Sequence, residues 1–331
     1  MKFEVAPRLV RYWLDGVSVP ATITTFSEGE TPEPDADGLV KASILIEVGK
    51  IAEIVTGNAP QDGVPQLHAQ RRIVLPRLVD IHTHLDKGHV FRRAPNPDGT
   101  FFGARETVGR DREANWNADD VAARMDFALR CAYHHGTGAI RTHLDSIGKQ
   151  TAISWGVFDE MRRAWKDRIA LQAVCLMPIV NVIDNPEEFE AIVTEVNRYE
   201  GVLGAVTFLG EKPDAKLDAA LDRMIEVAKT EGLDLDFHVD ESSSPHARSL
   251  ERIADALIRH KFEGKALAVS TNAGADGGYL VPEETEREIG RRLASISPIR
   301  AISGHRQVSS NVYRKPFLIT GAATGWVGET A

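Results

Sequence analysis

Five short apolar runs recur along the middle of the chain, and their regular spacing constrains the fold more than any other feature. They begin at residues 138, 169, 202, 233 and 266, so neighbouring runs start 31 to 33 residues apart. Amphipathic segments lie between or beside them, at 119–134, 153–165, 186–199, 216–230 and 247–260. A repeated strand–helix unit of this size predicts a parallel sheet, either open or closed into a barrel. An open, doubly wound sheet is disfavoured because no glycine-rich dinucleotide loop follows an early strand.

The first 75 residues follow a different pattern. Short alternating or apolar runs are separated by polar residues, and Glu28–Gly38 has the glycine, proline and acidic composition of a loop. Val48-Gly49-Lys50 can form a hairpin turn between two of the runs. We therefore expect an N-terminal β segment over residues 1–75, and a first barrel strand at Ile73–Asp80.

Composition narrows the class of protein. The 331 residues are 43% hydrophobic and 26% charged, as in a folded globular protein, and the net charge of −9 argues against a nucleic-acid partner. No apolar run is long enough to span a bilayer, and the N-terminus lacks the apolar region of a signal peptide. Two cysteines, Cys131 and Cys175, cannot form a disulfide framework. We expect a cytoplasmic protein with a small-molecule partner and no membrane partner, and we leave homo-oligomers open.

The sharpest motif is Val79-Asp-Ile-His-Thr-His84. Residues i and i+2 of a strand share a face, so His82 and His84 present two imidazoles side by side. At the end of a first barrel strand they would lie where such barrels carry their active sites. Two neutral imidazole nitrogens suit a metal ion such as zinc or iron. The alternative is a chance pair of structural histidines.

Two further strand ends carry candidate residues. The run from Leu235 ends in His238, which can complete a three-histidine face, and Glu241 follows three residues later. A carboxylate there can take a proton from water and pass it on without binding the metal. In Arg141-Thr-His-Leu-Asp145, a histidine and an aspartate share one face. Each pair also fits a purely structural role, as core histidine, helix cap or hydrogen-bond partner.

Together these motifs resemble the amidohydrolase superfamily, over roughly residues 40–268. The resemblance rests on His82-x-His84 after a β segment and on His238-x-x-Glu241 at the fifth barrel strand. Other segments look like the cytosine deaminase branch of that superfamily; they are Leu85-Asp86, Arg141–Asp145, Leu171-Gln172 and Phe237–Glu241.

The resemblance implies a distorted TIM-type (β/α)8 barrel, a small β-sandwich built from both chain ends, and one bound Fe²⁺ or Zn²⁺. Glu241 would carry a proton to the departing ammonia. The residues that would bind the metal are His82, His84 and His238. The residues that would contact the substrate or orient these ligands are His143, Asp145 and Gln172.

The last quarter of the chain departs from the family's pattern. Members carry a histidine after the sixth strand and a metal-binding aspartate after the eighth, but this chain reads Ala268-Val-Ser-Thr-Asn272 and contains no aspartate after Asp276. Ile299–Ser303 and Phe317–Thr320 are the candidate seventh and eighth strands. We therefore expect a barrel over residues 76–268, incomplete at strands seven and eight. The tail at 269–331 is anomalous, as a shifted reading frame or a truncation would make it.

The expected function is metal-dependent hydrolytic deamination of a small nitrogen heterocycle. Cytosine itself is disfavoured, because Met177-Pro178 stands where cytosine deaminases place a glutamine that reads the pyrimidine. Two alternatives stay open. One is hydrolysis of another C–N bond, as in an N-alkylamino-triazine or a cyclic amide. The other is a truncated barrel without activity, because two family positions are missing.

Overall fold

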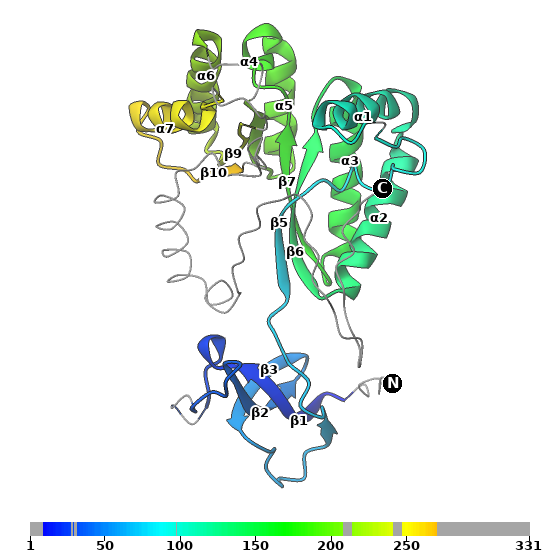
Figure 1. The fold of residues 1–331 in the computed structure, drawn as a ribbon, viewed down its shortest axis with the longest axis vertical. Helices are drawn as coiled ribbons and strands as arrows, with labels where there is room; N and C mark the ends of the chain where they lie inside the picture. The colour runs from blue at the N-terminus through cyan, green and yellow to red at the C-terminus, as the bar shows by residue number, and fades with distance from the viewer. Residues whose placement is uncertain are drawn as a thin grey trace.

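The computed structural model describes residues 9–27, 29, 32–96, 98–207, 214–240 and 247–269. These residues form a small N-terminal β-sheet and a larger mixed α/β part, and strand β5 (Leu78–Thr83) leads from the first to the second (Figure 1). Within these ranges, no helix is both long and apolar enough to cross a membrane.

The N-terminal sheet has four strands in the order β3-β2-β1-β4. Their bounds are β1 Arg11–Pro20, β2 Leu39–Glu47, β3 Lys50–Thr56 and β4 Gln66–His68, with a 3-10 helix at Ala21–Ile23. Val48 and Gly49 adopt positive φ angles of 50° and 73° in the tight turn between β2 and β3. The expected hairpin therefore forms at this point, where glycine meets little steric resistance.

The larger part is built on six parallel strands. They are β5, β6 Thr137–Asp145, β7 Ala170–Leu176, β8 Leu203–Val206, β9 Leu235–His238 and β10 Ala266–Val269. Strands β5 to β7 pair in sequence, and so do β8 to β10. Backbone hydrogen bonds from Cys175 to Val202 (3.1 Å) and from Val206 to Met177 (2.8 Å) join the two sets. The five regularly spaced apolar runs are therefore neighbouring parallel strands, as the spacing predicted.

Helices pack against this strand array (Figure 1). Five of them fall on the predicted amphipathic segments: α2 Ala118–His134, α3 Lys149–Trp165, α5 Pro186–Arg198, α6 Ala215–Glu231 and α7 Ser249–Arg259. Two more, α1 Phe101–Asn115 and the short α4 Asn181–Asp184, were not predicted.

The described strands do not close into a barrel, because β5 and β10 each pair on one side only within these residues. The two segments predicted as strands seven and eight lie outside the described residues. The prediction of a first barrel strand at Ile73–Asp80 was wrong at its start. Ile73 bridges Ser18 of β1, and β5 begins only at Leu78. Pro76 has no N–H to donate, which favours a break in pairing there. The division into domains at residue 75 stays a prediction.

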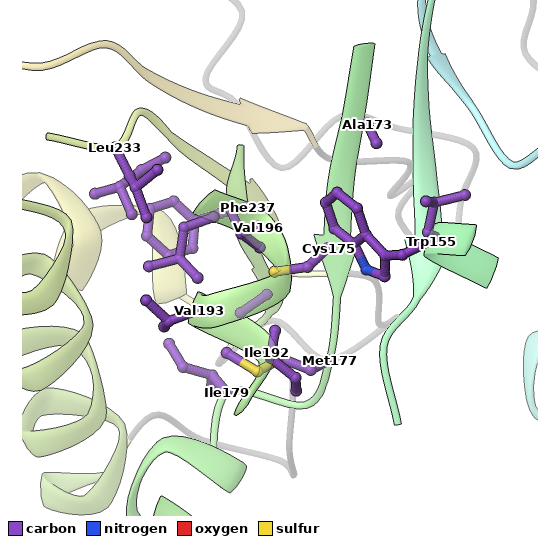
Figure 2. Packing of buried hydrophobic residues seen from close by; sticks show 14 of the residues in the cluster. Trp155, Ala173, Cys175, Met177, Ile179, Ile192, Val193, Val196, Leu233 and Phe237 are labelled. Atoms are coloured by element: carbon purple, nitrogen blue, oxygen red, sulfur yellow. The ribbon is translucent and has the colours of Figure 1, made fainter. Parts of the chain in front are cut away.

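The main hydrophobic core lies between the parallel strands and the helices. Trp155 of α3, Cys175 of β7, Ile192 of α5 and Phe237 of β9 meet in it, each at most 1% exposed (Figure 2). Side chains alternate along a strand, so Phe237 on the helix side places its neighbours Asp236 and His238 on the opposite side. Burying this core therefore sets which strand residues face the candidate site.

Candidate metal centre

Four histidines lie at the carboxyl ends of three parallel strands. His82 is in β5 and His84 follows the last residue of that strand, while His143 is in β6 and His238 ends β9. The carboxyl ends of parallel strands meet at the same edge, so these side chains converge although they are far apart in sequence.

The four imidazole rings form a compact cluster. One ring nitrogen from each lies within 4.8 Å of those of the others. The Nε2 atoms of His84 and His238 are 3.4 Å apart, and the ring centroids of His82 and His143 are 4.4 Å apart. Ligands about 2 Å from one ion have comparable separations. The structure thus brings together the three histidines singled out as ligands and adds His143. The sequence showed that His143 lies at a strand end, but it did not show that His143 would lie beside the three proposed ligands.

Burial keeps three of these rings neutral. Loss of water around the ring lowers the pKa of His82, His84 and His238, in His238 to about 3. Positive charge on neighbouring histidines or on Lys87 would act in the same direction. A neutral imidazole carries one nitrogen lone pair, so each ring can donate to a cation.

The cluster also leaves hydrogen-bonding capacity unused. Nδ1 of every histidine in it is buried and has no hydrogen-bond partner among the described residues. A buried polar atom without a partner destabilises the folded state, and a cation bound through Nδ1 would satisfy that atom in any ring that does not bind the ion through Nε2. Neutral nitrogens in this number and proximity fit a divalent transition-metal ion.

Asp145 and Asp86 connect the ends of β5 and β6, two of the three strands that carry the histidines. Asp145 lies 2.6 Å from Nζ of Lys87 and accepts a hydrogen bond from Arg112 at 2.9 Å. Asp86 is fully buried and accepts hydrogen bonds from the Asp145 N–H at 2.8 Å and from the Ser154 hydroxyl at 2.9 Å. Burial and the nearby Asp145 carboxyl raise the pKa of Asp86. This network fixes the turn after His84 against the end of β6.

Among the remaining predicted site residues, Gln172 is not one of the clustered side chains. Oε1 of Gln172 accepts a hydrogen bond from Nε of Arg141 at 2.8 Å. Glu241 lies outside the described residues. Met177 is 0% exposed in the hydrophobic core, so its side chain does not line the site as a glutamine there would.

Comparisons with known proteins give the chain its relatives. The sequence model of the Amidohydrolase family matches residues 73–314, and so continues past Ala268 into the segment predicted to be anomalous. The chain is 45% identical over 267 residues to a pterin deaminase of Rhizobium rhizogenes, covering 80% of this chain and 59% of that protein. It is 23% identical to an N-isopropylammelide isopropyl amidohydrolase of a Pseudomonas species, covering 60% of this chain and 50% of that one.

Solved structures share the fold. A 5-methylcytosine deaminase of Klebsiella pneumoniae superposes with a TM-score of 0.64 at 19% identity, covering 85% of this chain and 63% of that one. An N-isopropylammelide isopropylaminohydrolase of Burkholderia multivorans gives a TM-score of 0.59 at 22% identity, covering 87% and 66%. The chain therefore spans between half and two thirds of the length of these relatives.

Proposed function

Because the chain belongs to the amidohydrolase family, we propose that it hydrolytically deaminates a nitrogen heterocycle of the pterin class at one bound metal ion. The observation that carries the proposal is the four-histidine cluster, in a chain 45% identical to a pterin deaminase. In this reaction the bond between a ring carbon and its exocyclic amino nitrogen breaks, water supplies the oxygen that replaces the amino group, and ammonia leaves.

His82, His84 and His238 would hold the ion, and Zn²⁺ or Fe²⁺ suits their neutral nitrogens. A bound ion of this kind lowers the pKa of a water molecule and polarises the carbon under attack. The contribution of the chain is to keep three imidazoles unprotonated and close together, which burial at the strand ends achieves.

Glu241 is the proposed proton carrier. It follows His238 by three residues, and a carboxylate beside the reacting water can accept its proton and return it to the leaving nitrogen. Support for this role comes from the sequence spacing and the family resemblance.

Asp145 and Gln172 are proposed to orient other groups rather than to contact the substrate. Each already accepts a hydrogen bond from an arginine, Asp145 from Arg112 and Gln172 from Arg141. Their contacts hold β6 against its neighbours and so fix the position of His143.

The test is ammonia release by the purified chain loaded with Zn²⁺ or Fe²⁺, across pterins, pyrimidines, purines and triazines. We expect turnover to be fastest with a pterin and to be lost in His84→Ala, but retained in His134→Ala, which changes an exposed histidine at the end of α2. Metal bound without ammonia release from any compound would instead support a barrel without activity.

A second candidate is hydrolysis of an N-alkylamino-triazine. The 23% identity to an N-isopropylammelide isopropyl amidohydrolase favours it, although less strongly than the 45% identity to the pterin deaminase. The two reactions differ in their product, since one releases ammonia and the other an alkylamine. Chromatography of the released amine therefore separates them in one assay.

A further inference from the structure

His143 differs from the other three histidines because one of its ring nitrogens is already bonded to a carboxylate. It is fully buried, and its Nε2 lies 3.1 Å from Oδ1 of Asp236. Its Nδ1 is buried without a partner among the described residues. The ring centroid lies 4.4 Å from that of His82 and 4.6 Å from that of His238. Nε2 of His143 is therefore already hydrogen-bonded, while its ring lies next to two of the proposed metal ligands, His82 and His238.

Asp236 is held in turn by Arg141. Its side chain is 0% exposed, and its Oδ2 accepts a hydrogen bond from Nη1 of Arg141 at 3.2 Å. Nε of the same arginine donates to Gln172 at 2.8 Å. A single chain of hydrogen bonds thus links β7, β6 and β9 and ends on the ring of His143. It fixes the carboxylate on one side of His143.

We propose that Asp236, fixed by Arg141, holds His143 in the tautomer with hydrogen on Nε2, and that His143 then offers its Nδ1 lone pair as a fourth imidazole ligand. Asp236 is a positioning residue, because it acts through the ring of His143. The ligand role rests on the proposed function, since it requires that the cluster bind a metal ion.

The opposite tautomer is disfavoured on both sides of the ring. With hydrogen on Nδ1, the Nε2 lone pair would face the Asp236 carboxylate oxygen at 3.1 Å, so two acceptors would oppose each other inside the protein. The Nδ1 hydrogen would remain buried without an acceptor among the described residues. A carboxylate that orients a histidine in this way also makes the ring a stronger metal ligand.

The first experiment reads the tautomer directly in the metal-free chain. Proton–nitrogen correlation spectra of ¹⁵N-histidine-labelled protein distinguish a protonated ring nitrogen from one with a lone pair, and His143→Gln assigns the signals. We expect hydrogen on Nε2 in the wild type and a loss of this preference in Asp236→Asn, because an amide can also donate. Hydrogen on Nδ1 in the wild type would overturn the proposal.

The second experiment measures the affinity for Zn²⁺ by competition with a chelating dye. Asp236→Asn should weaken binding roughly 10- to 100-fold. The matched control is Asp234→Asn. Asp234 directly precedes β9 and accepts a hydrogen bond from the N–H of Lys265, and this variant should bind Zn²⁺ as the wild type does. If Asp236→Asn fails to fold, Arg141→Lys tests the same chain and should give a smaller loss of affinity.

A double-mutant cycle separates positioning from a general structural effect. In a His143→Gln background, Asp236→Asn should have little further effect on affinity, because the ring through which it acts is gone. Additive losses would overturn the positioning role. Failure of the wild type to bind Zn²⁺ would remove the ligand role together with the proposed function. Metal binding and ammonia release that are insensitive to Asp236→Asn would overturn this proposal alone.

Discussion

At the scale of single residues, Cys175 shows how closely β7 and β8 approach each other. Its Sγ lies 3.1 Å from both the amide nitrogen and the carbonyl oxygen of Gly204. Burial raises the pKa of the Cys175 thiol to about 12, so the thiol stays protonated at neutral pH and is a poor nucleophile or metal ligand. Cys131 and Cys175 are both free, in agreement with the absence of a disulfide framework expected from composition.

Gly204→Ala tests this close approach. A Cβ at residue 204 would lie 2.5 Å from the carbonyl oxygen of Cys175 and 2.9 Å from that of Asp236, so the backbone would have to shift. We expect a loss of about 1 to 3 kcal/mol in the free energy of unfolding, measured by urea denaturation. Gly156→Ala in α3 is the matched control, because a Cβ there meets nothing within 4 Å. It should stabilise the chain by about 0.5 to 1 kcal/mol, and equal effects at the two sites would contradict the packing argument.

At the scale of elements, α1 is held by ion pairs rather than by a broad apolar face. Arg93 makes two hydrogen bonds to Asp111 of α1, at 2.8 and 2.9 Å, and also contacts Asp120 of α2. Next to Asp111, in the last turn of α1, Arg112 donates a hydrogen bond to Asp145 at the end of β6. This explains why hydrophobic periodicity did not predict α1, since the contacts that stabilise it come from other segments.

Arg93→Met should make the chain less stable by an amount that depends on pH. Burial raises the pKa of Asp111, but hydrogen bonds from Arg93 and from Trp116 outweigh it, so this pKa lies below its usual value. Hydrogen bonds from Arg93 and from Arg124 likewise hold the pKa of Asp120 below its usual value. A lowered carboxyl pKa stabilises the fold above the unfolded value of about 3.9, and this stabilisation disappears as the pH falls through the folded value.

We therefore expect the variant to lose about 1 to 2 kcal/mol of its free energy of unfolding at pH 7. This is low for charged hydrogen bonds, because the Arg93 side chain is 37% exposed and solvent weakens its ion pairs. The difference from the wild type should shrink below about pH 4. Urea denaturation at several pH values measures it, and a difference that stays constant into acid would contradict the ion-pair explanation.

At the scale of the whole molecule, the histidine cluster joins strands that are distant in sequence. His84 and His238 are 154 residues apart, yet their Nε2 atoms are 3.4 Å apart. A metal ion held by both would cross-link β5 to β9 only in the folded chain. A ligand that binds only the folded state stabilises it, so metal should raise the stability of the whole strand array.

Chelation of the metal should therefore lower the free energy of unfolding. With free Zn²⁺ at 100 times its Kd, removal by a chelator should cost about 2.7 kcal/mol, measured as a shift of the urea transition. His238→Ala should show little response to the same chelator, because it lacks one of the proposed ligands. An unchanged wild-type transition on chelation would mean that the cluster does not bind the ion in the folded state.

The sequence by itself determined the alternation of strands and helices and the residues at the strand ends. Five predicted helical segments and five spaced strands appear where expected, because both follow from local periodicity and from local start and stop signals. The two-residue spacing alone predicted that His82 and His84 share a face. The start of β5 could not be predicted locally, because Ile73 pairs with Ser18 of a strand far away in sequence.

Only the tertiary structure decided which side chains meet. The hydrogen bond between His143 and Asp236 joins residues 93 apart, and that between Arg141 and Gln172 joins partners on the neighbouring strands β6 and β7. No local pattern encodes such contacts, because they depend on the register of parallel strands joined by helices. Core packing sets the register of the strands, and this register places His143 beside the other three histidines. The sequence alone had suggested only that His143 contacts the substrate or orients the ligands.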